Sequence, residues 1–68
     1  MQDVFEGFGT RLRELRQRAV LTQEELAERA GISVTTIILL ERGRRPPRPK
    51  TTRALARALG IRPTELVA

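Results

Sequence analysis

Two short helices joined by almost no intervening chain are the feature of this sequence that most limits its fold. The residues from Thr22 to Glu25, TQEE, match a capping box, in which the Thr22 hydroxyl accepts from the Glu25 amide and the Glu25 side chain reaches back to the Thr22 amide. Gly31 supplies the left-handed residue that commonly ends a helix, and Ser33 is suited to cap another helix only two residues later. The sequence therefore predicts two consecutive helices with a turn too short for a relaxed loop.

The residues at this turn have the sizes that a tight helix crossing requires. Ala27 is small at the point where the two helices would touch, and Gly31 tolerates the positive φ that the bend needs. Apolar residues with the spacing to close a small core against the preceding helix are Leu26, Ile32, Ile37 and Leu40. Residues 23–42 therefore have the spacing of a helix-turn-helix unit, and the competing interpretation is a generic helical hairpin.

Helical spacing also dominates the N-terminal part of the chain, and no segment alternates like a β-strand. Apolar residues recur every three or four positions from Phe5 to Ala19, which predicts a helix with one apolar face. Gly7 and Gly9 weaken the start of this helix, because glycine is a poor helix former.

Prolines predict a loop after the helix-turn-helix unit. Within residues 42–50, RGRRPPRPK, they remove backbone donors and favour extended geometry, so we expect no helix there and a basic, Pro-rich loop at 43–50. Thr51 or Thr52 would then cap a fourth helix that ends at Gly60.

A fifth helix would begin in residues 61–66, IRPTEL, because proline is favoured in the first turn of a helix. The predicted fold class is therefore all-α, a compact bundle of four to five short helices. A chain of 68 residues is expected to form a single domain, covering 1–68.

The positive charge of the chain is concentrated in its second half. The sequence has 13 Lys and Arg against 8 Asp and Glu, a net charge of +5, and 12 of the 13 cations are Arg. Arg presents a planar fork of donors that suits phosphates and guanine edges. Between Arg42 and Arg62 there are eight cations and no carboxylate. A solubilising surface would also be basic, but this one-sided distribution is typical of a protein that binds a polyanion.

The residue types that the chain lacks exclude several functional classes. With no Cys and no His, the chain can form neither a disulfide framework nor a thiolate zinc site, nor a Ser/His or Cys/His nucleophilic site. We therefore expect no enzymatic activity, no cofactor and no metal. The longest apolar run, Ile37–Leu40, has four residues, far below the ~20 needed to span a bilayer, so we expect a cytoplasmic protein with no membrane partner.

Several segments together resemble one known family. They are FGTRLRELRQRAVLTQEELAERAGIS, TI, LERGRRPPRP and LARALGI, and they are similar to the Cro/repressor-type helix-turn-helix family, also called the XRE family, over nearly the full length. The resemblance implies a lambda-repressor-like bundle of five short helices with the helix-turn-helix at its second and third helices. It also implies binding of double-stranded DNA as a homodimer and regulation of transcription, with repression as the expected outcome.

The resemblance assigns roles to residues at matching positions. It implies that Gln23 contacts a phosphate and braces the recognition helix, residues 33–42, and that Arg16 pairs with Glu41 as a structural brace. Residues that would contact base edges or nearby backbone are Ser33, Val34, Thr35, Thr36, Ile38 and Leu39. Residues of the basic loop that would contact phosphates are Arg44, Arg45, Arg48 and Lys50. The alternatives are an ordinary surface contact for the Arg16–Glu41 pair and a solvated linker for the loop.

Ile38 and Leu39 depart from the family pattern, because related sequences usually have polar or charged residues at these two positions. Only part of an apolar run that steps through more than a full helical turn can face the core, so we expect both side chains to be exposed. Three explanations stay open: DNA binding that depends on phosphate contacts and thymine methyls, a protein-interaction or self-association module, and a scaffold with an engineered surface. DNA binding ranks first because the basic loop is intact.

Overall fold

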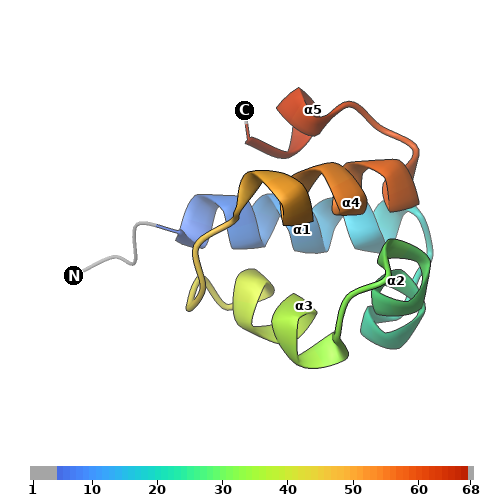
Figure 1. The fold of residues 1–68 in the computed structure, drawn as a ribbon, viewed down its shortest axis with the longest axis horizontal. Helices are drawn as coiled ribbons and strands as arrows, with labels where there is room; N and C mark the ends of the chain where they lie inside the picture. Colours follow the sequence, from blue (N-terminus) through green and yellow to red (C-terminus); the bar gives the residue numbers. More distant parts are fainter. Residues whose placement is uncertain (1–4, 68) are drawn as a thin grey trace.

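A computed structural model describes residues 5–67, which form five α-helices and no β-strand (Figure 1). The ends of the predicted 1–68 domain, residues 1–4 and 68, lie outside the described residues. The helices are α1 (Glu6–Arg18), α2 (Gln23–Ala30), α3 (Val34–Glu41), α4 (Pro49–Leu59) and α5 (Pro63–Val67). The predicted all-α bundle is confirmed.

The helices enclose one small apolar core. In Figure 1, α4 lies in front of α1, α5 lies above α4, and α2 and α3 lie together at the bottom of the view. Helix α1 packs on α3 and α5, while α4 packs on α2 and α5. The buried apolar side chains come from all five helices and from the turn before α2: Leu12, Leu21, Leu26, Ala27, Ile37, Leu40, Leu55, Ala56 and Leu66.

The first part of α1 is helical although Gly7 and Gly9 are expected to weaken it. The helix is continuous through Gly7 and Gly9, and Gly9 is buried. A Cβ at Gly9 would overlap the carbonyl oxygen of Leu40 and lie 2.6 Å from that of Glu41. Gly9 is therefore the point where the backbones of α1 and α3 meet. Ala19, which the periodicity places on the buried face, is the C-cap of α1 and is exposed.

Helix α4 begins earlier than the proline content predicted. Its N-cap is Arg48 and its first residue is Pro49, so the prediction that residues 49 and 50 lie in a loop, with a Thr51 or Thr52 cap, is wrong. The physical reason is that the first residue of a helix has no intrahelical use for an N–H, and the fixed φ of proline already suits it. Thr52 is instead buried inside the helix, whereas Gly60 ends α4 as predicted.

Helix α5 is short, and contacts with the core and with α1 hold it in place. Leu66 is buried in the core, and Arg11 Nε on α1 donates to the backbone oxygen of Glu65 at 2.9 Å. Among residues 5–67, no helix has the length and apolar character needed to cross a bilayer.

Val20 is held in an unfavourable backbone conformation between α1 and α2. Its φ is 56°, and its side chain is 85% exposed, so no packing compensates the conformation. A β-branched residue in this left-handed region is strained by roughly 1–3 kcal/mol. We expect Val20→Gly to raise the free energy of unfolding by about 1 kcal/mol, because glycine relieves this strain. The gain is smaller than the full strain energy, since glycine also adds entropy to the unfolded chain. Val20→Ala retains a Cβ and should gain less; equal gains in urea titrations would contradict this explanation.

Candidate nucleic-acid interface

The α2–α3 unit has the local geometry that its residue pattern predicted. The Glu25 amide donates to the Thr22 hydroxyl at 3.0 Å, and the Thr22 amide donates to Glu25 Oε1 at 2.9 Å, completing the capping box. Gly31 has a φ of 70°, and the Ile32 amide donates to the Ala27 carbonyl at 3.0 Å, closing the turn. The two helices are therefore held in a fixed crossing by their own caps.

Helix α3 begins at a side-chain cap that is exposed. The Thr36 amide donates to Ser33 Oγ at 3.1 Å, which satisfies one free N–H of the first turn. Ser33 and Thr35 are exposed, and Val34 and Thr36 are half-buried. The start of α3 thus presents hydroxyl groups to whatever approaches it.

The prediction that the Ile38 and Leu39 side chains are exposed is wrong. Both side chains are half-buried, and the large apolar side chains exposed most among the described residues are Val20 at 85% and Val67 at 60%. The Arg44 amide donates to the Leu39 carbonyl at 2.9 Å, which closes the C-terminal end of α3. An apolar patch on α3 is therefore smaller than an isolated helix would show.

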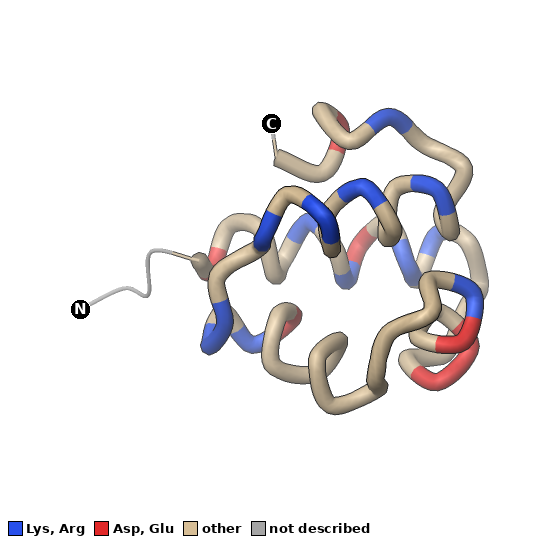
Figure 2. The backbone as a smooth tube through the Cα atoms, in the orientation of Figure 1, with Lys and Arg blue, Asp and Glu red and all other residues tan. Residues whose placement is uncertain are grey.

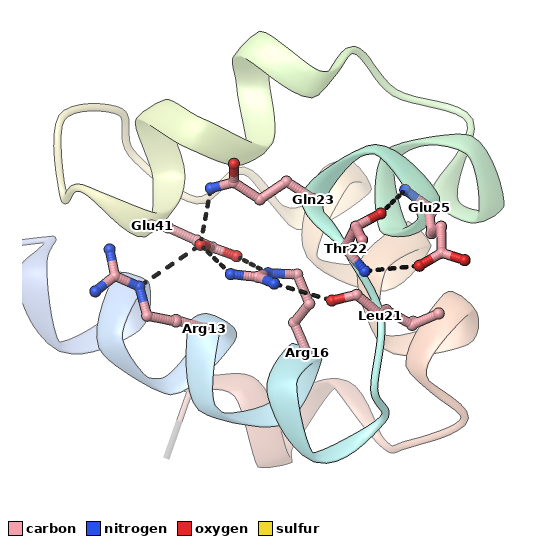
Figure 3. A network of polar contacts seen from close by, with 7 residues as sticks. All are labelled: Arg13, Arg16, Leu21, Thr22, Gln23, Glu25 and Glu41. Carbon is pink, nitrogen blue, oxygen red and sulfur yellow. Dashed lines mark hydrogen bonds and ion pairs between the residues drawn. The ribbon is translucent and has the colours of Figure 1, made fainter.

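A buried carboxylate fixes α3 against α1 and α2 (Figure 3). Arg16 donates to Glu41 through Nε at 2.6 Å and through Nη2 at 3.0 Å, and Gln23 Nε2 donates to Glu41 Oε1 at 3.1 Å. The Glu41 side chain has no exposed area, and that of Arg16 is 12% exposed. The hydrogen bond with Glu41 raises the pKa of the Arg16 guanidinium. Burial opposes that rise, and the nearby carboxylate charges add to it.

The Arg16–Glu41 pair implied by the resemblance is thus present, and Gln23 belongs to the same cluster. Arg13, which the sequence reasoning missed, lies 3.7 Å from Glu41. Its position one helical turn before Arg16 is the signal that could have indicated it. Arg16 also donates through Nη1 to the Leu21 carbonyl at 2.9 Å, so the cluster joins α1, the turn before α2, α2 and α3. The position of the recognition helix therefore depends on this cluster.

The cations of the basic loop lie beside α3, and α3 itself carries no Lys or Arg. Figure 2 shows Lys and Arg along the loop and α4, while the α3 tube is uncharged up to Glu41 at its end. Arg44, Arg48 and Lys50 are exposed, whereas Arg45 is half-buried and donates through Nη1 to Thr36 Oγ1 at 2.8 Å. A hollow of about 480 Å³ separates the loop from α3 and is lined by Ile32, Thr36, Leu40, Arg44, Arg45, Pro46, Arg48 and Thr51. The hollow brings three guanidinium groups and two hydroxyls together, a set that suits phosphate oxygens.

A sequence profile of the helix-turn-helix domain family matches residues 8–68. The chain belongs to this family. The match excludes the generic hairpin interpretation and confirms the predicted resemblance to repressor-type helix-turn-helix proteins.

Relatives of this helix-turn-helix chain are named as regulators. It is 53% identical over 51 residues to an uncharacterised HTH-type transcriptional regulator of Methanothermobacter thermautotrophicus, covering 75% of this chain and 74% of that protein. It is 44% identical over 57 residues to the HTH-type transcriptional repressor RghR of Bacillus subtilis, covering 82% of this chain and 42% of RghR. The crystal structure of the restriction-modification controller protein C.AhdI from Aeromonas hydrophila is similar with a TM-score of 0.89 at 42% identity, over 91% of this chain and 94% of that one.

The capping box makes the stability of this helix-turn-helix protein depend on pH. The bond from the Thr22 amide, with a smaller contribution from the Thr22 side chain, lowers the pKa of the Glu25 carboxyl below its ordinary value of 4.5. The stabilisation is therefore fully present above that value and is lost as the pH falls through the lower pKa of the folded state. Urea titrations from pH 7 to pH 3 should show that Glu25→Gln loses this acid-dependent part. Glu28→Gln, outside the capping box, should retain it, and identical pH profiles for wild type and Glu25→Gln would contradict the assignment.

Proposed function

We propose that this chain represses transcription by binding an inverted repeat in double-stranded DNA as a homodimer, with α3 of each protomer in a major groove. The observation that carries the proposal is the position of the exposed Ser33 and Thr35 beside a basic segment without carboxylates. Hydroxyl groups can contact base edges, and guanidinium groups hold the sugar–phosphate backbone on either side. The names of the relatives support regulation, and repression follows those of them that are repressors.

The phosphate contacts come from the basic loop and the start of α4. Arg44 and Arg48 are exposed and line the hollow beside α3, and Lys50 is exposed in the first turn of α4. Arg45 can add the guanidinium nitrogens that Thr36 does not occupy. Gln23 donates one amide hydrogen to Glu41 and carries a second one that can donate to a phosphate. The N-terminal end of α4 adds the positive end of a helix dipole. These contacts position the duplex without reading its sequence.

The proposed dimer surface lies at α5, on the opposite side of the bundle from α3 in Figure 1. Val67 is 60% exposed and lines a mainly apolar hollow of about 380 Å³ with Pro47, Pro49, Thr52, Arg53 and Pro63. For both α3 helices to enter successive major grooves, the two-fold axis must place them about 34 Å apart, one turn of DNA. We further propose that the protein acts in the cytoplasm, without catalysis, cofactor or metal. The rival protein-interaction module is not favoured, because Ile38 and Leu39 are half-buried.

DNA binding is tested by selecting duplexes from a random library and titrating the selected sequence at several salt concentrations. If each protomer neutralises about four phosphates, the slope of log K against log salt for the dimer should be about −7. Arg44→Gln or Arg48→Gln should make the slope less steep by about 2 per dimer, because each removes one phosphate contact per protomer. The control is Arg62→Gln, an exposed cation next to α5, which should leave the slope unchanged. A library that yields no preferred sequence, with weak binding that salt hardly alters, would overturn the proposal.

A further inference from the structure

Arg45 reaches from the basic loop back to the recognition helix. Its Nη1 donates to Thr36 Oγ1 at 2.8 Å, and Thr36 Oγ1 lies 2.9 Å from Ser33 Oγ. We propose that Arg45 is a positioning residue that orients the Ser33 hydroxyl as an outward hydrogen-bond donor and thereby sets which base edge α3 accepts. The inference rests on the proposed function, because it needs α3 in the major groove.

The hydrogen atoms in the series of hydrogen bonds from Arg45 through Thr36 to Ser33 can be assigned from the chemistry of the three side chains. A guanidinium only donates, so Arg45 occupies a lone pair of Thr36 Oγ1 and leaves the Thr36 hydroxyl hydrogen to be placed. The contact between the Ser33 and Thr36 hydroxyls can run in either direction. A cationic donor on the Thr36 oxygen polarises its O–H bond and makes that hydroxyl the better donor. Among residues 5–67 the structure gives the Thr36 hydroxyl no acceptor other than Ser33 Oγ, so Thr36 donates to Ser33.

Ser33 Oγ then accepts twice. It receives the Thr36 amide hydrogen at 3.1 Å as the N-cap of α3, and it receives the Thr36 hydroxyl hydrogen. A serine hydroxyl has two acceptor lone pairs and one hydrogen, so both lone pairs are occupied. Because Ser33 is exposed, its own hydrogen is the group left to point outward.

A hydroxyl that can only donate distinguishes bases that a free serine does not. In the major groove, guanine offers two acceptors, N7 and O6, and thymine offers O4, whereas the exposed amino group of cytosine is a donor. A freely rotating serine accepts from or donates to either kind of edge. With Arg45 in place, the base opposite Ser33 should therefore be guanine in preference to cytosine, by roughly two- to tenfold for one hydrogen bond. Arg45 would influence sequence readout although the resemblance implies a phosphate contact for it.

The test compares the base preferences of matched variants by selection from a random duplex library, followed by titration of single-base substitutions. Ser33→Ala identifies the position that Ser33 reads. Arg45→Met keeps the apolar stem but cannot donate, and Thr36→Val keeps the shape of Thr36 but removes its hydroxyl. Arg45→Lys restores a donor, and Arg44→Met is the control for losing one cation of the loop. Thermal melts confirm that each variant is folded.

We expect Arg45→Met and Thr36→Val each to remove the roughly two- to tenfold preference for guanine over cytosine at the base opposite Ser33. The base preferences at other positions should not change. The double variant should lose no more of this base preference than either single variant, because both substitutions remove the same series of hydrogen bonds. Arg45→Lys should retain the preference, and Arg44→Met should weaken binding to all sequences alike.

Two results would overturn the inference in distinguishable ways. If wild-type protein selects a sequence, but Arg45→Met weakens all duplexes uniformly like Arg44→Met, Arg45 is a phosphate ligand only and the proposed function stands. If wild-type protein selects no sequence, the proposed function is wrong, and so is the inference that rests on it.

Discussion

Glu41→Gln is expected to destabilise the protein by about 3–5 kcal/mol, the usual cost of breaking a buried ion pair by removing one partner. The substitution leaves the Arg16 guanidinium, only 12% exposed, without the negative charge that it faces at 2.6 Å. It also weakens the acceptor for Gln23 Nε2. A chain of this length has a total stability on the order of 3–10 kcal/mol, so the variant should be largely unfolded or melt far below the wild type. Urea and thermal unfolding followed by circular dichroism measure the loss.

Two comparisons assign this loss to the buried charge. Glu28→Gln removes an exposed carboxylate from α2 and should change stability by no more than ~0.5 kcal/mol. The double variant Arg16→Met/Glu41→Leu should recover part of the loss, because apolar replacement of both partners leaves no uncompensated charge. A Glu41→Gln protein as stable as Glu28→Gln would contradict the role assigned to Glu41.

Gly9→Ala is expected to destabilise the protein by about 2 kcal/mol or more, although alanine is the better helix former. The added Cβ would overlap the Leu40 carbonyl oxygen and lie 2.6 Å from the Glu41 oxygen and 2.9 Å from the Glu41 carbonyl carbon. Backbone atoms cannot rotate aside as a side chain can, so α1 and α3 would have to separate. Overpacking of this kind costs roughly 1–3 kcal/mol or more, which outweighs the ~1 kcal/mol that alanine contributes in a helix interior.

Gly7→Ala is the matched control in the same helix. Among residues 5–67, a Cβ at Gly7 would meet no atom within 4 Å outside its own helix backbone and chain neighbours. Only the helix propensity of alanine should therefore act there, raising stability by up to about 1 kcal/mol. The two substitutions should therefore change the unfolding midpoint in opposite directions. A gain for both would contradict the close approach of the α1 and α3 backbones at Gly9.

Local signals predicted the helix-turn-helix unit well. The capping box at Thr22, the left-handed Gly31 and the Ser33 cap each depend on atoms within a few residues of one another, and all three are present. Prediction failed where two local rules competed. Proline content predicts a loop at Pro49, although proline is equally suited to begin a helix, and the chain around it decides which role it takes.

The candidate site could be predicted only in part. The basic segment and the hydroxyls of α3 follow from residue types, and the Arg16–Glu41 pair came from the family resemblance and not from spacing. The contact between Arg45 and Thr36 had no signal in the sequence, because a loop of several residues can return to a helix in many ways. The half-burial of Ile38 and Leu39 likewise could not be predicted from a run of apolar residues.

Local patterns in the sequence predict the short helices, the places where the two central ones begin and end, and a basic segment typical of a protein that binds a polyanion. These properties depend on hydrogen bonds between near neighbours and on the order of charges along the chain. The packing of the helices, in contrast, is what makes Gly9 a backbone contact, buries Glu41 against Arg16 and Gln23, and brings Arg45 to Thr36. The physical reason is that each of these contacts joins residues on different elements, and their separation depends on how all five helices pack.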